Sequence, residues 1–145
     1  MIRFVLAAGL AVLSGGAMAA DTRVLVPMPD ASAQILLGDM RDHLTALDEI
    51  LGALAEGSAD VAATVAETRL GVDSTPRRHA EAIGPHMPPT MRDMALALHG
   101  SASRLAVAIR ESQRLGADEG QRRVFGALRE LSGTCSACHH AYRVR

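Results

Sequence analysis

The chain has no lysine and no tryptophan, and only two phenylalanines and one tyrosine among its 145 residues. The basic residues are therefore all arginine, and with 15 of them against 16 acidic residues the formal net charge is −1. A chain this close to neutrality lacks the basic excess typical of nucleic-acid-binding domains, so we expect no nucleic-acid partner. With so few aromatic rings the core must be built from aliphatic side chains and alanine, and a bound flat, apolar molecule would supply the missing bulk.

Apolar runs long enough to span a membrane are also missing. The stretch Phe4–Leu13 is too short to cross a bilayer. It follows Arg3 and precedes the small residues Ala17-Met18-Ala19, which together form the pattern of a cleaved secretory signal. We therefore expect residues 1–19 to be a signal peptide and residues 20–145 to form one domain. This domain would be periplasmic and not stably inserted in a membrane.

Strand patterns, internal repeats and low-complexity tracts are absent too, and apolar residues recur instead at spacings of three and four. This periodicity predicts four amphipathic helices with short connections, and a short helical turn between the second and the third. Such a set favours an all-α fold, an antiparallel up-down four-helix bundle. The expected helices are residues 30–56, 58–70 and 90–115 and a last one from residue 118 that reaches Tyr142, with Asp30, Ser58, Thr90 and Asp118 as N-caps; the turn is residues 76–82.

Two of the apolar stripes are important for function. In the first helix the stripe is expected to face inward, and in the last helix the stripe includes both cysteines of the chain. The first stripe consists of Leu37, Met40, Leu44, Leu47, Leu51 and Leu54, and the last of Val124, Leu128, Leu131, Cys135, Cys138 and Tyr142. Whatever the two cysteines bind is therefore expected to lie inside the bundle.

The cysteines belong to the run Cys135-Ser136-Ala137-Cys138-His139. C-x-x-C-H is the attachment signature of c-type haem, in which the two thiols form thioethers to one porphyrin and the adjacent histidine binds the iron. In an exported protein the alternative fate of two such cysteines is a disulfide. Thiol–disulfide exchange is a further alternative, but enzymes of that kind place C-x-x-C at a helix N-terminus, whereas this pair is expected deep in a helix.

Zinc is another alternative, with Cys135, Cys138, His139 and His140 as ligands. A structural zinc site usually joins two separate segments and so stabilises the fold. Four ligands within six residues of one helix would join little, so haem is the favoured reading.

The ending Cys135-Ser-Ala-Cys-His-His-Ala-Tyr-Arg143 resembles the C-x-x-C-H-x-x-Y-R ending of class II c-type cytochromes, the cytochrome c′ group. The likeness extends over residues 20–145 only as a pattern of helices. It implies one covalent haem c, with Cys135 and Cys138 as thioether anchors and His139 as the proximal iron ligand. It also implies that Tyr142 and Arg143 lie near the haem, with Arg143 able to approach a propionate.

Two functions follow from that resemblance, and neither is enzymatic. In one branch of the group a methionine of the first helix is the sixth iron ligand and the protein transfers single electrons, here to a periplasmic redox partner protein; the residue would be Met40. In the other branch the sixth position is open, and small gases such as NO or CO bind there. Leu37 or Leu44 would then cover the open side, and His43 is a rival ligand or hydrogen-bond donor. The resemblance is also compatible with a homodimer.

Overall fold

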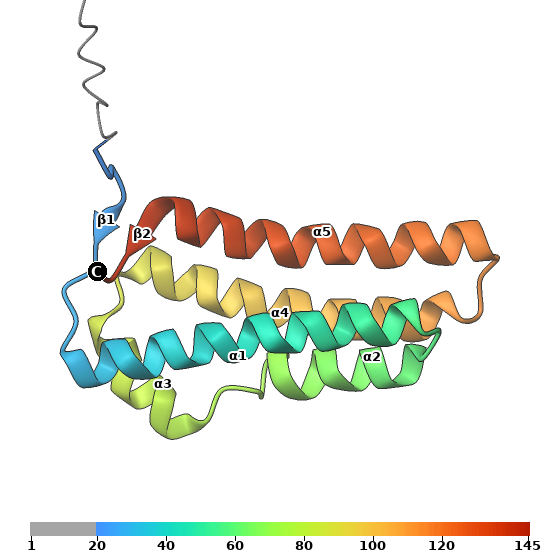
Figure 1. Cartoon of the computed structure of the whole chain (residues 1–145), viewed down its shortest axis with the longest axis horizontal. Coiled ribbons are helices and arrows are strands. Elements are labelled where there is room, and N and C mark those ends of the chain that lie inside the picture. Colours follow the sequence, from blue (N-terminus) through green and yellow to red (C-terminus); the bar gives the residue numbers. More distant parts are fainter. Residues whose placement is uncertain (1–19) are drawn as a thin grey trace, which may run out of the picture.

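The computed structural model describes residues 20–145, so the expected signal peptide, residues 1–19, lies outside the described residues. The described chain is mainly helical, which confirms the all-α class at that level (Figure 1). The elements in chain order are β1 (Val24–Leu25), α1 (Asp30–Ala55), α2 (Ala59–Val65), the π-helical turn η1 (Ala66–Leu70), α3 (Arg77–Ile83), the 3-10 turn η2 (Gly84–His86), α4 (Pro89–Ser112), α5 (Ala117–Ala141) and β2 (Tyr142–Arg143). None of the helices within residues 20–145 combines the length and the apolar character that crossing a membrane requires.

The long helices α1, α4 and α5 and the shorter α2 run back and forth along one axis (Figure 1). Glycines stand at the ends of two helical segments. Gly57 follows α1 with φ of 75°, a left-handed conformation that favours glycine. Gly71 ends the second helical segment because a Cβ atom there would lie 2.3 Å from the carbonyl oxygen of Glu67.

Three of the four predicted N-caps, Asp30, Thr90 and Asp118, are wrong. No helix among the described residues has a side-chain hydrogen bond at its N-cap, and Pro29, Pro88 and Gly116 stand where α1, α4 and α5 begin. Ser58 does hold the N-cap position of α2, but its hydroxyl makes no capping bond. At α1 and α4 the N-cap is a proline, whose fixed φ suits the entry to a helix, and the observed N-caps of α1, α4 and α5 lie one or two residues before the expected ones.

The larger core cluster is aliphatic and alanine-rich, as the scarcity of aromatic residues predicts. It fills the space between α1, α2, α4 and α5 and contains the fully buried Ile50, Leu105 and Ile109. On α4 the residues Met91, Leu98, Ala102, Leu105 and Ile109 are buried and form the face toward the core.

On α1 the predicted stripe is not the buried one. The core side of this helix is formed instead by Leu36, Ala46, Ile50 and Ala53. Leu44 and Leu51, two members of the predicted stripe, are 68% and 46% exposed. The observed core face is offset by about one residue from the predicted stripe. The reason is that the small alanines pack closest to the neighbouring helices, although the leucines are the more prominent pattern in the sequence.

The sequence shows no sign of the pair of short strands. β1, which precedes the first helix, lies parallel to β2, with Val24 opposite Tyr142 and Leu25 opposite Arg143. A further bond from the Val26 amide to the Arg143 carbonyl measures 2.8 Å. Val26 is only 1% exposed and joins a second, smaller core cluster with Leu36, Ile83 and Met91. The start and the end of the described chain therefore meet beside the last turn of α5.

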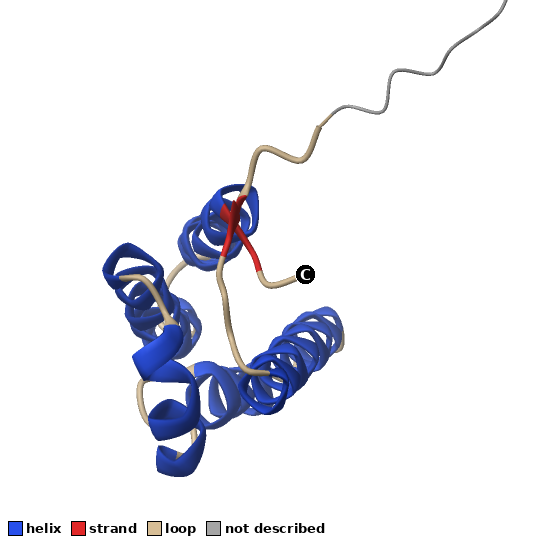
Figure 2. Cartoon of the chain, turned by 90° about the vertical axis from the view of Figure 1, so that its left-hand side faces the viewer, coloured by secondary structure: helices blue, strands red, loops and turns tan. Residues whose placement is uncertain are grey.

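Helices α1 and α5 do not pack extensively on each other, although each packs on its other neighbours: α1 on α2 and α3, and α5 on α4. Seen along the axis, α1 and α5 stand apart, with the C-terminal residues between them (Figure 2). The facing sides of these two helices carry the residues that the sequence singled out.

Candidate functional site

A cavity of about 600 Å³ lies between α1, α4 and α5. We call it the main cavity. Its size falls within the range of about 300–1,000 Å³ that is typical of small-molecule and cofactor sites. The α1 wall is formed by Leu36, Leu37, Met40, His43, Leu44 and Leu47, and the α4 wall by Met91, Met94, Ala95 and Leu98. Ten side chains from these two helices therefore surround it, and nine of them are apolar.

The third wall is the last part of α5, and it presents the motif. Cys135, Cys138 and His139 all line the main cavity. Cys135 packs against the larger core cluster and Cys138 against the smaller one, so the two thiols lie where the clusters meet. The helix explains this placement, because residues three and four apart share one face.

Both cysteines are free thiols that are partly buried. Burial raises the pKa of the Cys135 thiol and, together with the charge of Cys135, that of Cys138. Both thiols therefore stay protonated at neutral pH and are poor nucleophiles, which is the opposite of the low-pKa cysteine that thiol–disulfide exchange uses.

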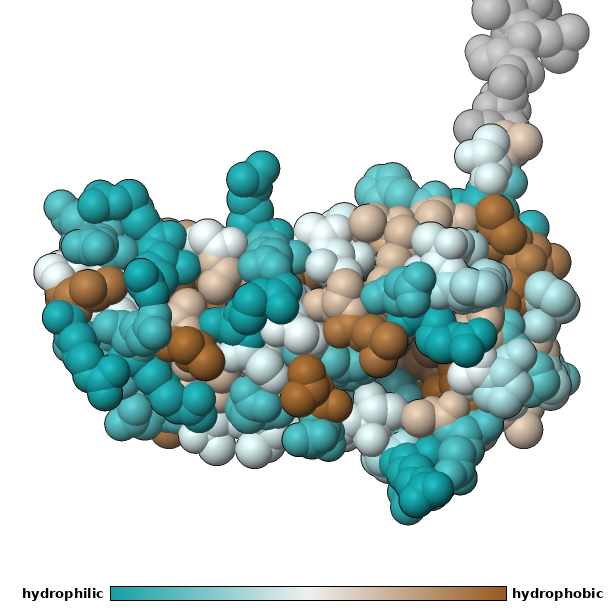
Figure 3. All heavy atoms as spheres, turned by 180° about the vertical axis from the view of Figure 1, so that it is seen from behind, coloured by the Kyte–Doolittle hydropathy of each residue, from teal (hydrophilic) through white to brown (hydrophobic). Residues whose placement is uncertain are grey.

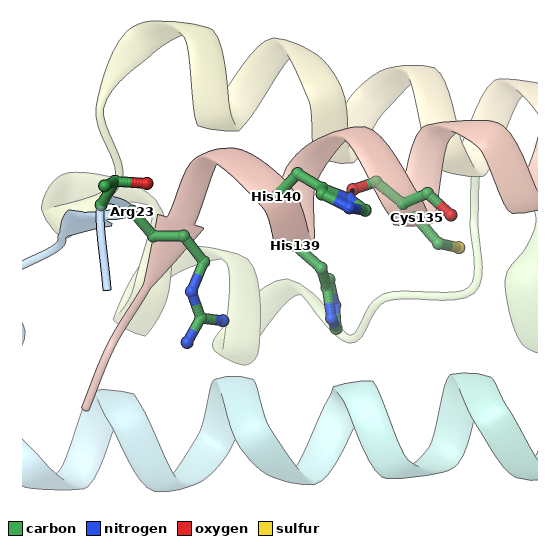
Figure 4. A pocket seen from close by; sticks show the side chains of 6 residues that line it. Arg23, Cys135, His139 and His140 are labelled. Carbon is green, nitrogen blue, oxygen red and sulfur yellow. Dashed lines mark hydrogen bonds between the residues drawn. The ribbon is translucent and has the colours of Figure 1, made fainter. Parts of the chain in front are cut away.

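His139 is exposed, and its ring extends from α5 toward α1 (Figure 4). It lies at the border between the main cavity and a second hollow of about 490 Å³, the outer groove, which is also lined by Thr22, Arg23, Cys135, Ser136 and His140. His140 lies along the helix instead, with Nδ1 2.7 Å from the Ser136 carbonyl oxygen. The two adjacent histidines thus have different environments, and only His139 lines the main cavity.

Met40 lies in the α1 wall and packs against the smaller core cluster, which also includes Cys138. A thioether on α1 and an imidazole on α5 therefore line the same cavity from different sides. Leu37 and Leu44, about one turn to either side of Met40, line it too. Leu44 keeps most of its surface exposed, and this part of the α1 stripe gives the cavity its apolar character.

His43 is the only polar side chain in the α1 wall. Its Nδ1 atom is buried and has no hydrogen-bond partner among the described residues. Its ring stands edge-on to that of His99, with 5.5 Å between the ring centroids. Burial first, and then the neighbouring His99, lower the pKa of His43, so its ring is neutral at pH 7.

His99 is itself held by the chain, with Nδ1 2.8 Å from the Leu70 carbonyl oxygen and Nε2 3.1 Å from the Thr75 hydroxyl. Since a carbonyl accepts only, Nδ1 carries the proton that it donates to Leu70. His79 pairs with Asp39 at 2.9 Å. Neither histidine lines the main cavity.

Two methionines and a histidine lie in the irregular segments near the cavity. Met87 lines the main cavity, whereas Met28 packs against the smaller core cluster and His86 does neither.

Three arginines line the main cavity in or beside β1 and β2. Arg143, expected near a propionate, lines the cavity together with Arg23 and Arg145, and the lining contains no Asp or Glu. The Arg143 Nε atom lies 3.3 Å from Asp21 Oδ2 in an ion pair, yet this buried nitrogen has no hydrogen-bond partner. Arg23 donates two hydrogen bonds to the same Asp21 carboxylate.

Sequence reasoning missed Arg23 and Arg145. No local signal could have found Arg23, because only the pairing of β1 with β2 carries it to the cavity.

The apolar surface seen from behind is scattered among polar side chains and gathers near the end from which the N-terminal segment leaves (Figure 3).

The side chains that line the main cavity are compatible with a c-type haem. Among residues 20–145 no three His, Cys, Asp or Glu side chains come together as a metal site, although Cys135, Cys138 and His139 share one wall. Two thiols spread along an apolar wall, one imidazole beside them and cations at the opening match a large flat molecule with an apolar body and acidic groups. Comparisons with family models, with curated proteins and with solved structures found no match for this chain.

Proposed function

We propose that this protein is a mono-haem c-type cytochrome with a four-helix bundle fold, in which α1, the α2–η1 segment, α4 and α5 are the four helices. Its function would be one-electron transfer. The observation that carries the proposal is that Met40, from a helix almost 100 residues away in the chain, lines the same cavity as Cys135, Cys138 and His139. The likeness of the C-terminal ending to class II cytochromes supports the same reading.

Haem, when bound, supplies reversible one-electron oxidation and reduction at its iron. Cys135 and Cys138 would hold it through thioether bonds, and His139 and Met40 would bind its iron. A thioether ligand favours the reduced state and raises the potential, which suits an electron carrier. The leucines and methionines of α1 and α4 would exclude water from the two faces, while the solvent-facing side beside His139 would leave an edge open to a partner.

Export to the periplasm, through residues 1–19, and a periplasmic redox partner belong to this proposal. The raised pKa of both thiols argues against the alternative in which the cysteines exchange disulfides.

The test is to produce the chain together with a haem-attachment machinery and to measure the intact mass after acid–acetone extraction. We expect a mass increase of one haem that extraction does not remove. Replacing both Cys135 and Cys138 by Ser should abolish the increase, whereas Ser136→Ala, which changes a residue between the two, should keep it. Unmodified thiols or a disulfide in the wild-type protein would refute the proposal.

A second candidate is a protein that binds small gases at an open sixth position. It is favoured by Leu37 and Leu44, which line the cavity on either side of Met40 and would cover the open face. The spin state separates the two functions, since methionine ligation gives a low-spin ferric spectrum and an open position a high-spin one.

A further inference from the structure

The N-terminal segment, residues 21–26, has no role in the proposed function so far, yet it brings a charged side chain to the main cavity. Arg23 lines both the main cavity and the outer groove. Its guanidinium extends toward α1 on the same side of α5 as the His139 ring (Figure 4). The segment is held in place by the pairing of Val24 with Tyr142 and by the burial of Val26.

Arg23 is oriented by Asp21. Its Nε and Nη2 atoms donate to the two carboxylate oxygens at 2.9 and 2.7 Å. The guanidinium has five N–H donors, so both hydrogens of Nη1 remain free for another acceptor. The same carboxylate lies 3.3 Å from the buried Arg143 Nε, which it does not satisfy with a hydrogen bond. Hydrogen bonds from Arg23 are the main reason that the pKa of Asp21 falls to about 2, so this carboxylate is charged at neutral pH.

The charges at the opening therefore point to an anionic group. Arg23, Arg143 and Arg145 line a largely apolar cavity whose lining contains no Asp or Glu, and the buried Arg143 Nε has no hydrogen-bond partner in the described part of the chain. Guanidinium groups bind carboxylates well because their N–H donors match the two oxygens. Asp21 shows that a carboxylate can be accommodated between Arg23 and Arg143.

We propose that residues 21–26 form part of the haem site and that Arg23 binds a carboxylate side group of the porphyrin beside Arg143, with Asp21 setting the direction of the guanidinium. This inference rests on the proposed function. It gives the segment before α1 a role in setting the reduction potential of the haem. A cation held beside the haem stabilises the reduced, less positive state of the iron, so the charge of Arg23 raises the reduction potential.

The experiment measures the reduction potential of the purified haem-loaded protein at low ionic strength. Arg23→Gln should shift the ferric-to-ferrous ratio at a fixed potential about threefold to tenfold toward the ferric form, or about 28 to 59 mV. Arg23→Lys should restore most of the shift because it keeps the charge. Arg122→Gln is the matched control, since it removes an equal charge from an exposed site on α5 outside the cavity.

Asp21→Asn is the second variant, and it should shift the potential upward because it removes a negative charge beside the same arginines. Opposite shifts in the two variants distinguish an electrostatic role from a general loosening of the segment, which would move both in one direction. If Arg23→Gln behaves like Arg122→Gln, or if both segment variants shift the potential the same way, the inference is wrong. The proposed function would survive that result, because haem attachment is measured separately by mass.

Discussion

Leu44 and Leu51 provide a test of where the haem lies, since they are leucines seven residues apart on α1 that are both exposed. Leu44 lines the main cavity, while Leu51 does not. Full burial of a leucine side chain stabilises a protein by about 1.5–3 kcal/mol. With 68% of Leu44 exposed, contacts within the chain account for roughly 0.5–1 kcal/mol; with 46% of Leu51 exposed, they account for roughly 0.8–1.6 kcal/mol.

Without a bound group, Leu44→Ala should therefore destabilise the protein less than Leu51→Ala. A haem in the main cavity would cover the exposed part of Leu44, so the cost of Leu44→Ala should rise to about 1.5–3 kcal/mol or more once a cavity is left behind. The cost of Leu51→Ala should not change. The order of the two variants is thus expected to reverse when haem is attached.

The assay is equilibrium unfolding in urea, with helical circular dichroism as the signal. The two variants are compared in the haem-loaded protein and again in a background with Cys135 and Cys138 replaced by Ser, which cannot attach haem covalently. If Leu44→Ala remains the milder change in the haem-loaded protein, the haem does not lie against α1 and the reasoning from the main cavity fails. Both changes replace leucine by alanine within one helix, so differences in helix propensity largely cancel.

Two further predictions concern the α1 wall. Met40→Ala should convert a low-spin ferric visible spectrum into a high-spin one, whereas Met94→Ala, from the α4 wall of the same cavity, should leave it low-spin; the opposite pattern would assign the ligand to α4. Burial lowers the pKa of His43 below its usual 6.5, so the unfolded chain takes up this proton more readily than the folded one. The contribution of His43 to the free energy of unfolding should therefore be fully present above pH 6.5. It should decrease as the pH falls from there toward the pKa of His43 in the folded protein. His43→Leu should lose less stability than the wild type between about pH 7.5 and pH 5.5 in urea titrations, and an equal loss in both would mean that His43 is not a buried neutral ring.

Much of the fold was predictable from the sequence because the information is local. Apolar spacing of three and four marks helices wherever the chain runs, so the four main helical segments and the short one after Pro76 were expected close to their observed bounds. The N-caps of α1 and α4 were not predictable, since proline can open a helix where a polar cap was expected.

The side of α1 that is buried could not be derived from the pattern of leucines. Leu44 and Leu51 match the expected stripe, yet Ala46, Ile50 and Ala53 form the packed face. Small residues allow helices to approach closely, and only the neighbouring helices decide which side approaches. The displaced leucines of the stripe then line the cavity or face solvent.

By itself the sequence determined the C-x-x-C-H motif, the helices and the face of the last helix on which Cys135 and Cys138 lie, because a helix places residues three and four apart together whatever surrounds it. Only the tertiary structure decided that Met40 shares a cavity with that motif, that the Nδ1 atom of His43 is buried with no hydrogen-bond partner in residues 20–145, and that Arg23 lines the cavity. Those placements depend on contacts between segments that are distant in the chain. Such contacts are set by packing and by the pairing of β1 with β2, which no local pattern of residues records.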